Sequence, residues 1–258
     1  MKNLELKTWD SSIKITVVMA TYNGENYLFD QLSSIVDQLT ENDELVISDD
    51  GSSDETLVII NRFLGNNVRL VKNRHRKGPV LNFQNGLGYA KGDVVVLADQ
   101  DDVWCLNRLD IIRNHFISSI SRFDLLVLDS QVVDKDLVQV HESVFGLLKA
   151  GPGILKNLYK NTYIGCHLAF KKELLNAILP LPNRIPMHDV WIGIVSEILG
   201  DVTFKPGATM KFRRSGNNFT QKNNNWFVRI RWRWNLVVNL VLFIVDFIVI
   251  KKLERGGR

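Results

Sequence analysis

The chain has 258 residues, a length that can bury a full hydrophobic core and that fits one large domain or one domain with an appendage. Hydrophobic residues make up 45% and charged residues 23%, without low-complexity tracts, which excludes a disordered or fibrous protein. The net charge of +4 leaves nucleic acid, a membrane surface or an anionic substrate open as partners. Much of the positive excess lies late in the chain, from Lys205 onward.

Cysteine usage and the N-terminus both bear on the compartment. Cys105 and Cys166 form neither a CxxC pair nor a Cys/His metal spacing and cannot build a disulfide framework, which is typical of a reducing compartment. The segment from Met1 to Lys14 mixes charges with apolar residues and lacks the uninterrupted apolar stretch of a signal peptide. We therefore expect the protein to stay in the cytoplasm.

The first half of the chain alternates predicted strands and helices. The strands are predicted over residues 13–19, 44–48, 68–71 and 93–98, and the helices from residue 25, from residue 54 and over residues 79–90. The strand that ends at Ala98 is apolar, as in parallel sheets that are buried on both faces. Strands that alternate with helices imply right-handed βαβ crossovers and a doubly wound α/β sheet.

Three polar loops directly follow predicted strands. They are Thr21–Gly24, Asp49–Asp54 and Asp99–Asp102. In a doubly wound sheet the ligand crevice lies beyond the carboxyl ends of the strands, so all three loops should face it. The second half is less regular, with a strand over 125–133, a helix after residue 153, a strand near 163–170 and a helix over 190–199.

The third loop is a candidate metal site. Asp99, Asp101 and Asp102 place three carboxylates within four residues at the mouth of a buried strand. Their repulsion would be costly without a cation, and Mg²⁺ or Mn²⁺ suits them because such ions need only one or two carboxylates besides substrate phosphates. The alternative is a solvated acidic loop in which Asp102 caps the following helix. The buried strand and the two neighbouring loops favour the metal.

The second loop has a structural explanation and a functional one. Ser52 and Glu55 fit a capping box, and Gly51 fits a turn with positive φ. Neither feature explains the adjacent Asp49 and Asp50, which would suit hydrogen bonds to a base imide or to ribose hydroxyls. The sequence has no glycine-rich phosphate loop of the dinucleotide-binding or P-loop type, so a metal must hold the phosphates.

Four motifs occur in the order found in inverting family 2 glycosyltransferases of the GT-A fold, which the chain resembles from about residue 15 to residue 220. The motifs are Val18-Met19-Ala20-Thr21-Tyr22-Asn23-Gly24, Asp49-Asp50-Gly51-Ser52, Asp99-Gln100-Asp101-Asp102-Val103-Trp104 and His188-Asp189-Val190-Trp191. The acidic motif resembles that of the bacterial rhamnosyltransferase-like branch, which builds surface polysaccharides. Each motif is short, but four in this order are specific.

The resemblance implies how a sugar donor would be bound. Thr21, Tyr22 and Glu25 would line the nucleotide pocket. Asp49 or Asp50 would read the base and the ribose.

The resemblance also assigns the reacting groups. Asp99 and Asp101 would form the D-x-D motif that meets the ribose and the metal, with Asp102 beside them. Asp189 would be the catalytic base that deprotonates the acceptor hydroxyl as it attacks the anomeric carbon from the face opposite the diphosphate. Independently of the family, Asp189 could be the N-cap of the next helix, and we expect His188 to be a packing residue.

A later segment, Phe212–Asn218, resembles a family segment in which a histidine often stands where this chain has Ser215. That departure weakens any metal or phosphate role of the segment, although Arg213 or Arg214 could still meet the diphosphate.

The C-terminal tail is mostly aromatic and aliphatic, with arginines between tryptophans. Its apolar part, Leu236–Ile250, would reach roughly 22 Å, short of a hydrocarbon core of about 30 Å, which disfavours a spanning helix. Arg231, Asn235, Asn239 and Asp246 share one sector of a helical wheel and leave a broad apolar face, as in an interfacial helix. The alternative is that this face packs on the domain or on a second subunit.

These observations predict a GT-A glycosyltransferase domain over residues 1–222, with a nucleotide-binding half (13–104) and an acceptor half (105–222), and an amphipathic helical tail over 223–258. The expected reaction is metal-dependent, inverting transfer of one sugar from a UDP- or dTDP-sugar to a glycan or lipid-linked glycan in bacterial surface polysaccharide synthesis. Peripheral membrane contact through residues 226–250 would place the enzyme at the inner face of the cell membrane, and we expect no nucleic-acid partner.

Two alternatives stay open. A nucleotidyltransferase also combines an α/β sheet with acidic metal ligands, but it would need a basic glycine-rich loop near the N-terminus, which this sequence lacks. A non-catalytic nucleotide-sugar-binding subunit would not need both the acidic loop and Asp189.

Overall fold

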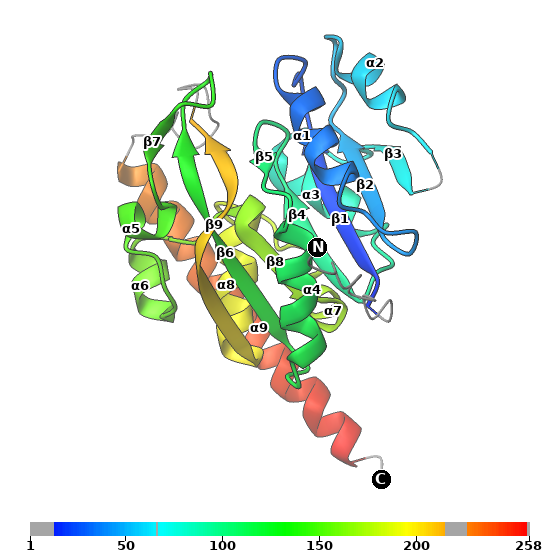
Figure 1. The fold of residues 1–258 in the computed structure, drawn as a ribbon. Helices are drawn as coiled ribbons and strands as arrows, with labels where there is room; N and C mark the ends of the chain where they lie inside the picture. Colours follow the sequence, from blue (N-terminus) through cyan, green and yellow to red (C-terminus); the bar gives the residue numbers. More distant parts are fainter. Residues whose placement is uncertain (1–12, 66, 215–225, 257–258) are drawn as a thin grey trace, which may run out of the picture.

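A computed structural model describes residues 13–65, 67–214 and 226–256. Strands and helices alternate in the first half and mix in the second (Figure 1). In chain order the elements are β1 (Ile15–Thr21), α1 (Leu28–Val36), β2 (Glu44–Asp49), α2 (Thr56–Asn61), β3 (Val68–Lys72), α3 (Pro79–Leu87), β4 (Val94–Ala98), β5 (Val103–Trp104), α4 (Arg108–Ser118), β6 (Asp124–Val133), β7 (Gln139–His141), α5 (Val144–Leu148), α6 (Ile154–Tyr159), the 3₁₀ turn η1 (Gly165–His167), β8 (Leu168–Lys171), α7 (Lys172–Ile178), α8 (His188–Leu199), β9 (Asp201–Arg213) and α9 (Trp226–Gly256).

The strands of the described residues form one nine-stranded sheet in the order β3-β2-β1-β4-β8-β6-β9-β5, with β7 paired to β6 beside this path. The four strands β3, β2, β1 and β4 are parallel. Strand β8 runs antiparallel to both β4 and β6, whereas β6 and β9 are parallel. The predicted α/β class is therefore confirmed, but the sheet is parallel only in its first half and is mixed beyond β4.

Helices cover both faces of the sheet because successive side chains of a strand point to opposite sides. In β4, Val94, Val96 and Ala98 belong to one hydrophobic core, together with α1 and α4. Val95 and Leu97 belong to a second core, together with α3, α8 and the first half of α9. Burial on both faces is the reason that this strand is apolar along its whole length.

The parallel strands place the three polar loops at one edge of the sheet. Thr21 pairs with Asp49 at the ends of β1 and β2, and Met19 pairs with Ala98 at the end of β4. The loops that follow these three strand ends therefore lie next to one another, as the sequence predicts.

The second half departs further from the sequence-based expectation. The strand expected near residues 163–170 is the 3₁₀ turn η1 followed by the shorter β8. The sequence does not predict β9, because Pro206 and Gly207 interrupt it and its register against β6 shifts twice. Strand β9 nevertheless lies between β6 and β5 and so reaches the acidic loop.

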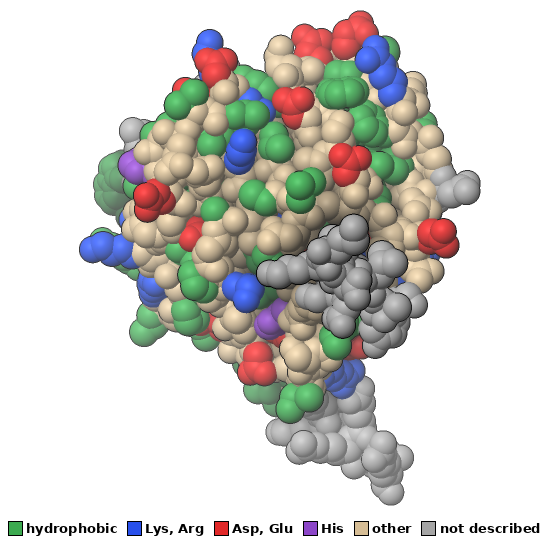
Figure 2. Space-filling view, in the orientation of Figure 1, with side chains coloured by type: hydrophobic (Ala, Val, Ile, Leu, Met, Phe, Trp, Pro, Cys, Tyr) green, Lys and Arg blue, Asp and Glu red, His purple; other side chains and the backbone are tan. Residues whose placement is uncertain are grey.

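The surface in Figure 2 carries acidic and basic side chains side by side, with hydrophobic ones between them. Over the described residues of this face, neither sign of charge forms a continuous field.

The C-terminal helix α9 is 31 residues long, and its end projects beyond the rest of the fold (Figure 1). Leu236 and Leu240 are buried against the domain. Asn235 and Asn239 donate hydrogen bonds to backbone carbonyls of the loop before α8. Part of the polar sector expected from the helical wheel thus faces the protein rather than water.

The opposite side of α9 is apolar and exposed. Its exposed large hydrophobic residues are Trp226, Phe227, Ile230, Trp234, Val237, Val238, Val241, Leu242, Ile244, Val245, Ile248 and Val249. Within the 24 residues Trp226–Val249, an 18-residue window has a mean hydropathy of 1.7, so by length and composition this helix could cross a membrane. The length argument against a spanning helix, which considered only residues 236–250, therefore does not hold for the whole helix.

A buried ion pair ties α4 to the start of the sheet. Arg113 Nη2 lies 2.7 Å from Asp43 Oδ2, and the two side chains are only 4% and 0% exposed. Arg113 also donates to the carbonyl of Ile13, and Asp43 accepts from the backbone of Ile15.

Loss of this pair should destabilise the domain strongly. We expect Arg113→Leu to lower the free energy of unfolding by about 3–5 kcal/mol in urea denaturation, because it leaves the Asp43 carboxylate buried without its counter-ion. The matched control is Arg69→Leu, which removes the half-exposed ion pair with Glu44 at 3.7 Å and should cost less than about 1 kcal/mol. Equal effects of the two variants would contradict this account.

Candidate active site

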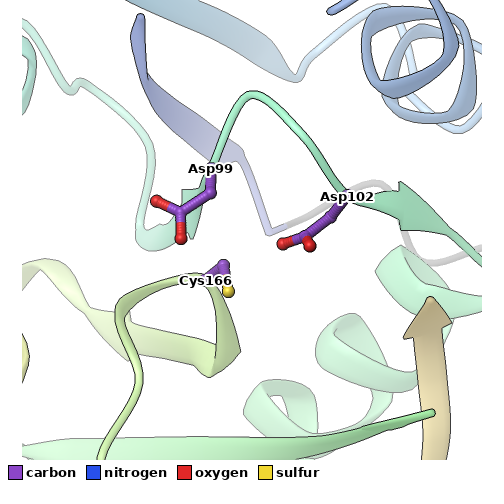
Figure 3. Close-up of side chains that lie close together, drawn as sticks. All are labelled: Asp99, Asp102 and Cys166. Atoms are coloured by element: carbon purple, nitrogen blue, oxygen red, sulfur yellow. The ribbon is translucent and has the colours of Figure 1, made fainter. Parts of the chain in front are cut away.

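The acidic loop joins β4 to β5 and directs two carboxylates toward one another. Figure 3 shows Asp99 at the end of β4 and Asp102 before β5, with the Cys166 thiol beside both. Candidate ligand atoms of these three residues lie within 4.8 Å of one another. The loop backbone is fixed from outside, because Gln31 donates to the Asp99 carbonyl and Arg213 Nε donates to the Asp101 carbonyl.

Burial raises the pKa of all three carboxyl groups of the loop, and repulsion by neighbouring carboxylates adds to this at Asp99 and Asp102. Burial, followed by the charge of Asp101, raises the pKa of Asp99 to about 7. Burial and then the charges of Asp101 and Asp99 raise the pKa of Asp102 well above its ordinary value. Burial also raises the pKa of Asp101, although Arg213 favours its charged form. One oxygen of Asp102, Oδ2, has no hydrogen-bond partner among the described residues. The loop therefore offers carboxylate oxygens that a cation would stabilise.

Cys166 contributes little to a hard-metal site. Burial, and then the charges of Asp102 and Asp99, raise the pKa of its thiol well above the ordinary value. A neutral thiol is a poor ligand, and Mg²⁺ and Mn²⁺ prefer oxygen. The donor set that fits such an ion consists of the carboxylates.

Arg108 lies fully buried beneath the acidic loop, and the sequence analysis did not identify it. Its Nη2 donates to the Cys166 carbonyl at 2.7 Å, and its Nη1 donates to the Thr209 hydroxyl. Burial lowers the pKa of Arg108 to about 10, so the guanidinium stays charged at neutral pH, and its charge interacts with that of Asp102. A buried arginine on α4 therefore partly balances the acidic loop from below.

Asp49 shapes the second loop and has no acceptor capacity to spare. Its Oδ1 accepts from the backbone N–H groups of Gly51 and Ser52, both at 2.9 Å. Its Oδ2 accepts from the hydroxyls of Ser52 at 2.5 Å and Thr21 at 3.1 Å. These four bonds use the four acceptor positions of the carboxylate. Gly51 has the positive φ that was predicted, at 86°.

The capping box predicted for α2 is wrong. The Ser52 hydroxyl binds Asp49, and α2 begins only at Thr56. The Asp54 carboxylate accepts a hydrogen bond from the backbone N–H of Thr56. The carboxylate of Glu25, just after the first loop, accepts one from the backbone N–H of Glu55. Asp54 and Glu25, rather than the predicted box, therefore satisfy the start of this helix.

Asp50 keeps free acceptor positions. It is 8% exposed and accepts from Asn73 Nδ2 at 2.5 Å and from the backbone N–H of Gly78 at 2.8 Å. Two of its four acceptor positions remain. Of the two adjacent aspartates, Asp50 is therefore the one with capacity for a ligand.

The first loop is joined to the acidic loop by a glutamine. Gln100 accepts from the backbone N–H of Tyr22 at 2.8 Å and donates to the Tyr22 carbonyl at 3.1 Å. A Cβ atom at Gly24 would lie 2.5 Å from Gln100 Oε1, so this contact requires glycine. The Tyr22 ring is 49% exposed beside the same loop, with Lys77 Nζ 5.2 Å from its centroid.

Asp189 lies on α8, near enough to the acidic loop for its charge to act on Asp99. It is the second residue of α8, and the N-cap is Met187, so the predicted capping role of Asp189 is wrong. Its Oδ1 accepts from Asn161 Nδ2 at 3.2 Å and from the backbone N–H of Val190 at 2.5 Å. Burial raises the pKa of Asp189 to about 7, and its charge in turn raises the pKa of Asp99. Both carboxyl groups therefore act on one crevice.

His188 packs instead of reacting. Its ring lies 4.2 Å from that of Phe83, and neither ring nitrogen has a hydrogen-bond partner in the part of the chain that the structure describes. Burial lowers the pKa of His188 to about 3, so the ring is neutral.

Arg213 holds the acidic loop and is not available for a diphosphate. It is 3% exposed, stacks on Tyr27, donates to the carbonyls of Asp101 and Lys135, and lies 3.8 Å from an oxygen of Asp30. Its backbone N–H also binds Asp102. Arg213 is thus engaged by the protein itself, whereas Arg214 is exposed, so the expectation that one of the two meets the diphosphate stays a prediction. Ser215 and the residues up to 225 lie outside the described part of the chain.

Comparison with known proteins agrees with this geometry. The model of "Glycosyl transferase family 2" matches residues 16–118, which include the first three loops. The Escherichia coli protein WfgD, a UDP-Glc:alpha-D-GlcNAc-diphosphoundecaprenol beta-1,3-glucosyltransferase, is 24% identical over 246 residues that cover 92% of each chain. Residues 16–118 thus match glycosyltransferase family 2, and the curated relative and the solved structure that resemble the chain are glycosyltransferases.

Solved structures of glycosyltransferases share the fold. Staphylococcus aureus TarS in complex with UDP-GlcNAc superposes with a TM-score of 0.66 at 19% identity, over 83% of this chain and 62% of the TarS chain. Glucosyl-3-phosphoglycerate synthase from Mycobacterium tuberculosis, in complex with Mn²⁺, UDP and glucosyl-3-phosphoglycerate, gives a TM-score of 0.55 at 20% identity over 79% of this chain and 73% of that one. The predicted GT-A fold is confirmed, and the rhamnosyltransferase-like branch stays a prediction.

The raised pKa of Asp189 makes the stability of the folded protein depend on pH. Between its ordinary value of 3.8 and about 7, the folded protein keeps a proton that the unfolded chain has released, so this group's contribution to stability falls as the pH rises through that window. We expect Asp189→Asn, which mimics the neutral carboxyl, to unfold with a free energy on the order of 2 kcal/mol higher than the native protein at pH 8 in EDTA.

The difference should shrink toward zero near pH 4, which urea denaturation at several pH values measures. Asp201→Asn, at an exposed position at the start of β9, is the control and should change stability by less than about 0.5 kcal/mol at each pH. A constant offset for Asp189→Asn would contradict the raised pKa.

Proposed function

We propose that this glycosyltransferase is metal-dependent and inverting, and that it moves one sugar from a UDP-sugar, or a dTDP-sugar, to a lipid-linked glycan in bacterial polysaccharide synthesis. The observation that carries the proposal is the pair Asp189 and Asp99: the charge of buried Asp189, on α8, acts on the partly buried Asp99 at the end of β4. A base on one side and a diphosphate site on the other is the arrangement that in-line displacement at an anomeric carbon needs.

The nucleotide would lie over the first two loops. Asp50 has the free acceptor positions to receive the imide N–H of uracil or thymine, while Asp49 and Thr21 keep the loop in shape. The exposed ring of Tyr22 offers a stacking surface. UDP is supported as the nucleotide because WfgD uses UDP-Glc and TarS binds UDP-GlcNAc.

The carboxylates of Asp99, Asp101 and Asp102 would hold Mg²⁺ or Mn²⁺. Their raised pKa values and the unpaired Oδ2 of Asp102 fit a cation at this loop. When bound, such an ion stabilises the negative charge that grows on the leaving diphosphate. The Mn²⁺ complex of glucosyl-3-phosphoglycerate synthase supports a divalent cation here.

Asp189 would accept the proton of the acceptor hydroxyl. A base with a pKa of about 7 is ionised in half of the molecules at neutral pH and matches the operating pH. The bond from Asn161 to Oδ1 orients the carboxylate and leaves Oδ2 for the hydroxyl. The acceptor oxygen then attacks from the side opposite the diphosphate, which inverts the configuration at the anomeric carbon.

Removal of the base should abolish transfer without loss of donor binding. We expect Asp189→Asn to lower kcat by about 10²- to 10⁴-fold with Mn²⁺ and a UDP-sugar, while the shift in melting temperature caused by UDP stays that of the native protein. For the native enzyme, kcat/KM should fall about tenfold per pH unit below the pKa of the base, because protonated Asp189 cannot accept a proton.

The controls separate the alternatives. EDTA and Asp101→Asn should both remove transfer, and added Mn²⁺ should restore only the native enzyme. A fully active Asp189→Asn variant would show that the base is elsewhere, and activity that survives EDTA would remove the metal. Binding of a UDP-sugar without any turnover would favour the non-catalytic subunit, and nucleotidyl transfer would favour the other alternative enzyme.

Helix α9 would attach the enzyme to the cytoplasmic face of the membrane. Its polar residues Asn235 and Asn239 bond to the domain, and a row of large apolar residues on its opposite side is exposed, whereas a helix on a soluble surface exposes polar residues. A helix whose first half packs on the domain can lie along the membrane surface instead of crossing the membrane. A lipid-linked acceptor would be found at the same membrane surface.

Vesicle flotation tests this attachment. We expect the native protein to float with vesicles of phosphatidylglycerol and phosphatidylethanolamine. The double variant Trp234→Ser with Val245→Ser should reduce the bound fraction at least about tenfold, because it removes two apolar side chains that are exposed in the protein and would be buried in the lipid. Ile120→Ser with Leu106→Ser, two exposed apolar residues elsewhere, is the matched control and should float like the native protein. A stable dimer that does not float would instead assign this face to a second subunit.

A further inference from the structure

A cavity of about 740 Å³ lies beside the crevice, between the start of α3, the loop before α8 and the first turns of α9. Four of its lining residues are cations: Arg76, Lys77, Arg184 and Arg231. The rest of the wall is mostly apolar. No carboxylate is among the described residues that line it.

The four cations are available to a ligand. All four are exposed, and none forms an ion pair with a carboxylate of the described residues. Three of them are arginines, whose planar donors suit phosphate oxygens. Four like charges around one cavity repel each other, and an anion in the cavity relieves this repulsion.

The cavity lies between the proposed nucleotide site and the proposed base. Lys77 Nζ is 3.5 Å from the carbonyl of Gly51 in the second loop. Met187 lines the opposite side and stands two residues before Asp189. An anionic group bound here would therefore be close to a sugar whose hydroxyl reaches Asp189.

The third side of the cavity belongs to α9. Arg231, Trp232 and Asn235 contribute to the lining from the helix that carries the exposed apolar face. Asn235 also donates to the carbonyl of Arg184 at 3.3 Å, which holds the loop before α8 against the helix. A ligand in this cavity thus has cations at one end and an apolar helix leading away from it.

We infer that this cavity binds the diphosphate of a diphospholipid-linked acceptor, with the lipid chain leaving along α9. The inference rests on the proposed function. The donor has its own diphosphate site at the acidic loop, and a second diphosphate needs a second set of positive charges. A neutral or water-soluble glycan would have no use for four unpaired cations next to an apolar wall.

The test compares two acceptors that differ only in charge: a GlcNAc-α-diphosphate carried on a short alkyl chain, and the same sugar and chain joined without phosphate. For the native enzyme, the KM of the diphosphate acceptor should be at least about a hundredfold lower. Arg184→Asn and Arg231→Gln should each raise that KM about tenfold. They should leave kcat, the KM of the UDP-sugar and the KM of the uncharged acceptor unchanged. Asparagine is chosen because Arg184 has a φ of 65°, a conformation that asparagine tolerates.

The control is the double variant Arg122→Gln with Lys205→Gln, which removes two exposed cations that do not line the cavity and should keep the native KM. Variants that raise the KM of the donor instead would assign the cavity to the nucleotide and overturn the inference. Unchanged acceptor KM values with normal transfer would overturn the inference and leave the proposed function intact.

Direct binding keeps the test independent of turnover. The labelled diphosphate amphiphile should bind the native protein, and Asp189→Asn, about a hundredfold more tightly than it binds Arg184→Asn with Arg231→Gln. If the protein transfers no sugar to either acceptor, the proposed function fails, and this measurement still decides whether the cavity holds a diphosphate. Equal binding of the amphiphile by the native protein and by Arg184→Asn with Arg231→Gln overturns the inference.

Discussion

The structure depends on the crowding of carboxylates at the end of a strand that is buried on both faces. Strand β4 can occupy the centre of the sheet only because it is apolar. Because β4 runs parallel to β1, the residues that follow it, Asp99, Asp101 and Asp102, lie at the same edge of the sheet as the loop after β1. Their repulsion is balanced from three sides. Arg108 lies beneath the loop, and Arg213 binds the loop backbone. The third side opens to the crevice, and a divalent cation is the complement that we propose for it.

The parts of the fold that were predictable are those in which local pattern and sheet geometry agree. The run of strand, polar loop and helix repeats through the first half, so the position of Thr21, Asp49 and Asp99 at one edge follows from the parallel arrangement alone. The role proposed for Asp189 rests on resemblance, since nothing in its local sequence distinguishes a base from a helix cap.

Other features depend on contacts that span the whole chain. Strand β9 is specified by pairing with β6 and β5, and its own residues include Pro206 and Gly207, which argue against a strand. Arg108 looks like an ordinary first-turn residue of a helix, and only the fold places it against Cys166, 58 residues further on. The capping box does not form because the Ser52 hydroxyl bonds to Asp49 instead of to the backbone of the helix. The motif alone does not reveal this competing local partner.

Gln100 gives the site a property that none of its motifs has alone. Its amide binds both backbone groups of Tyr22, so the loop that would receive the nucleotide and the loop that carries the acidic residues share a rigid connection. A ligand that orders one loop must also restrict the other, and thermodynamic reciprocity makes the effect equal in both directions. If the nucleotide and the cation bind as proposed, the two loops would respond to them together, and the two ligands would be linked rather than independent.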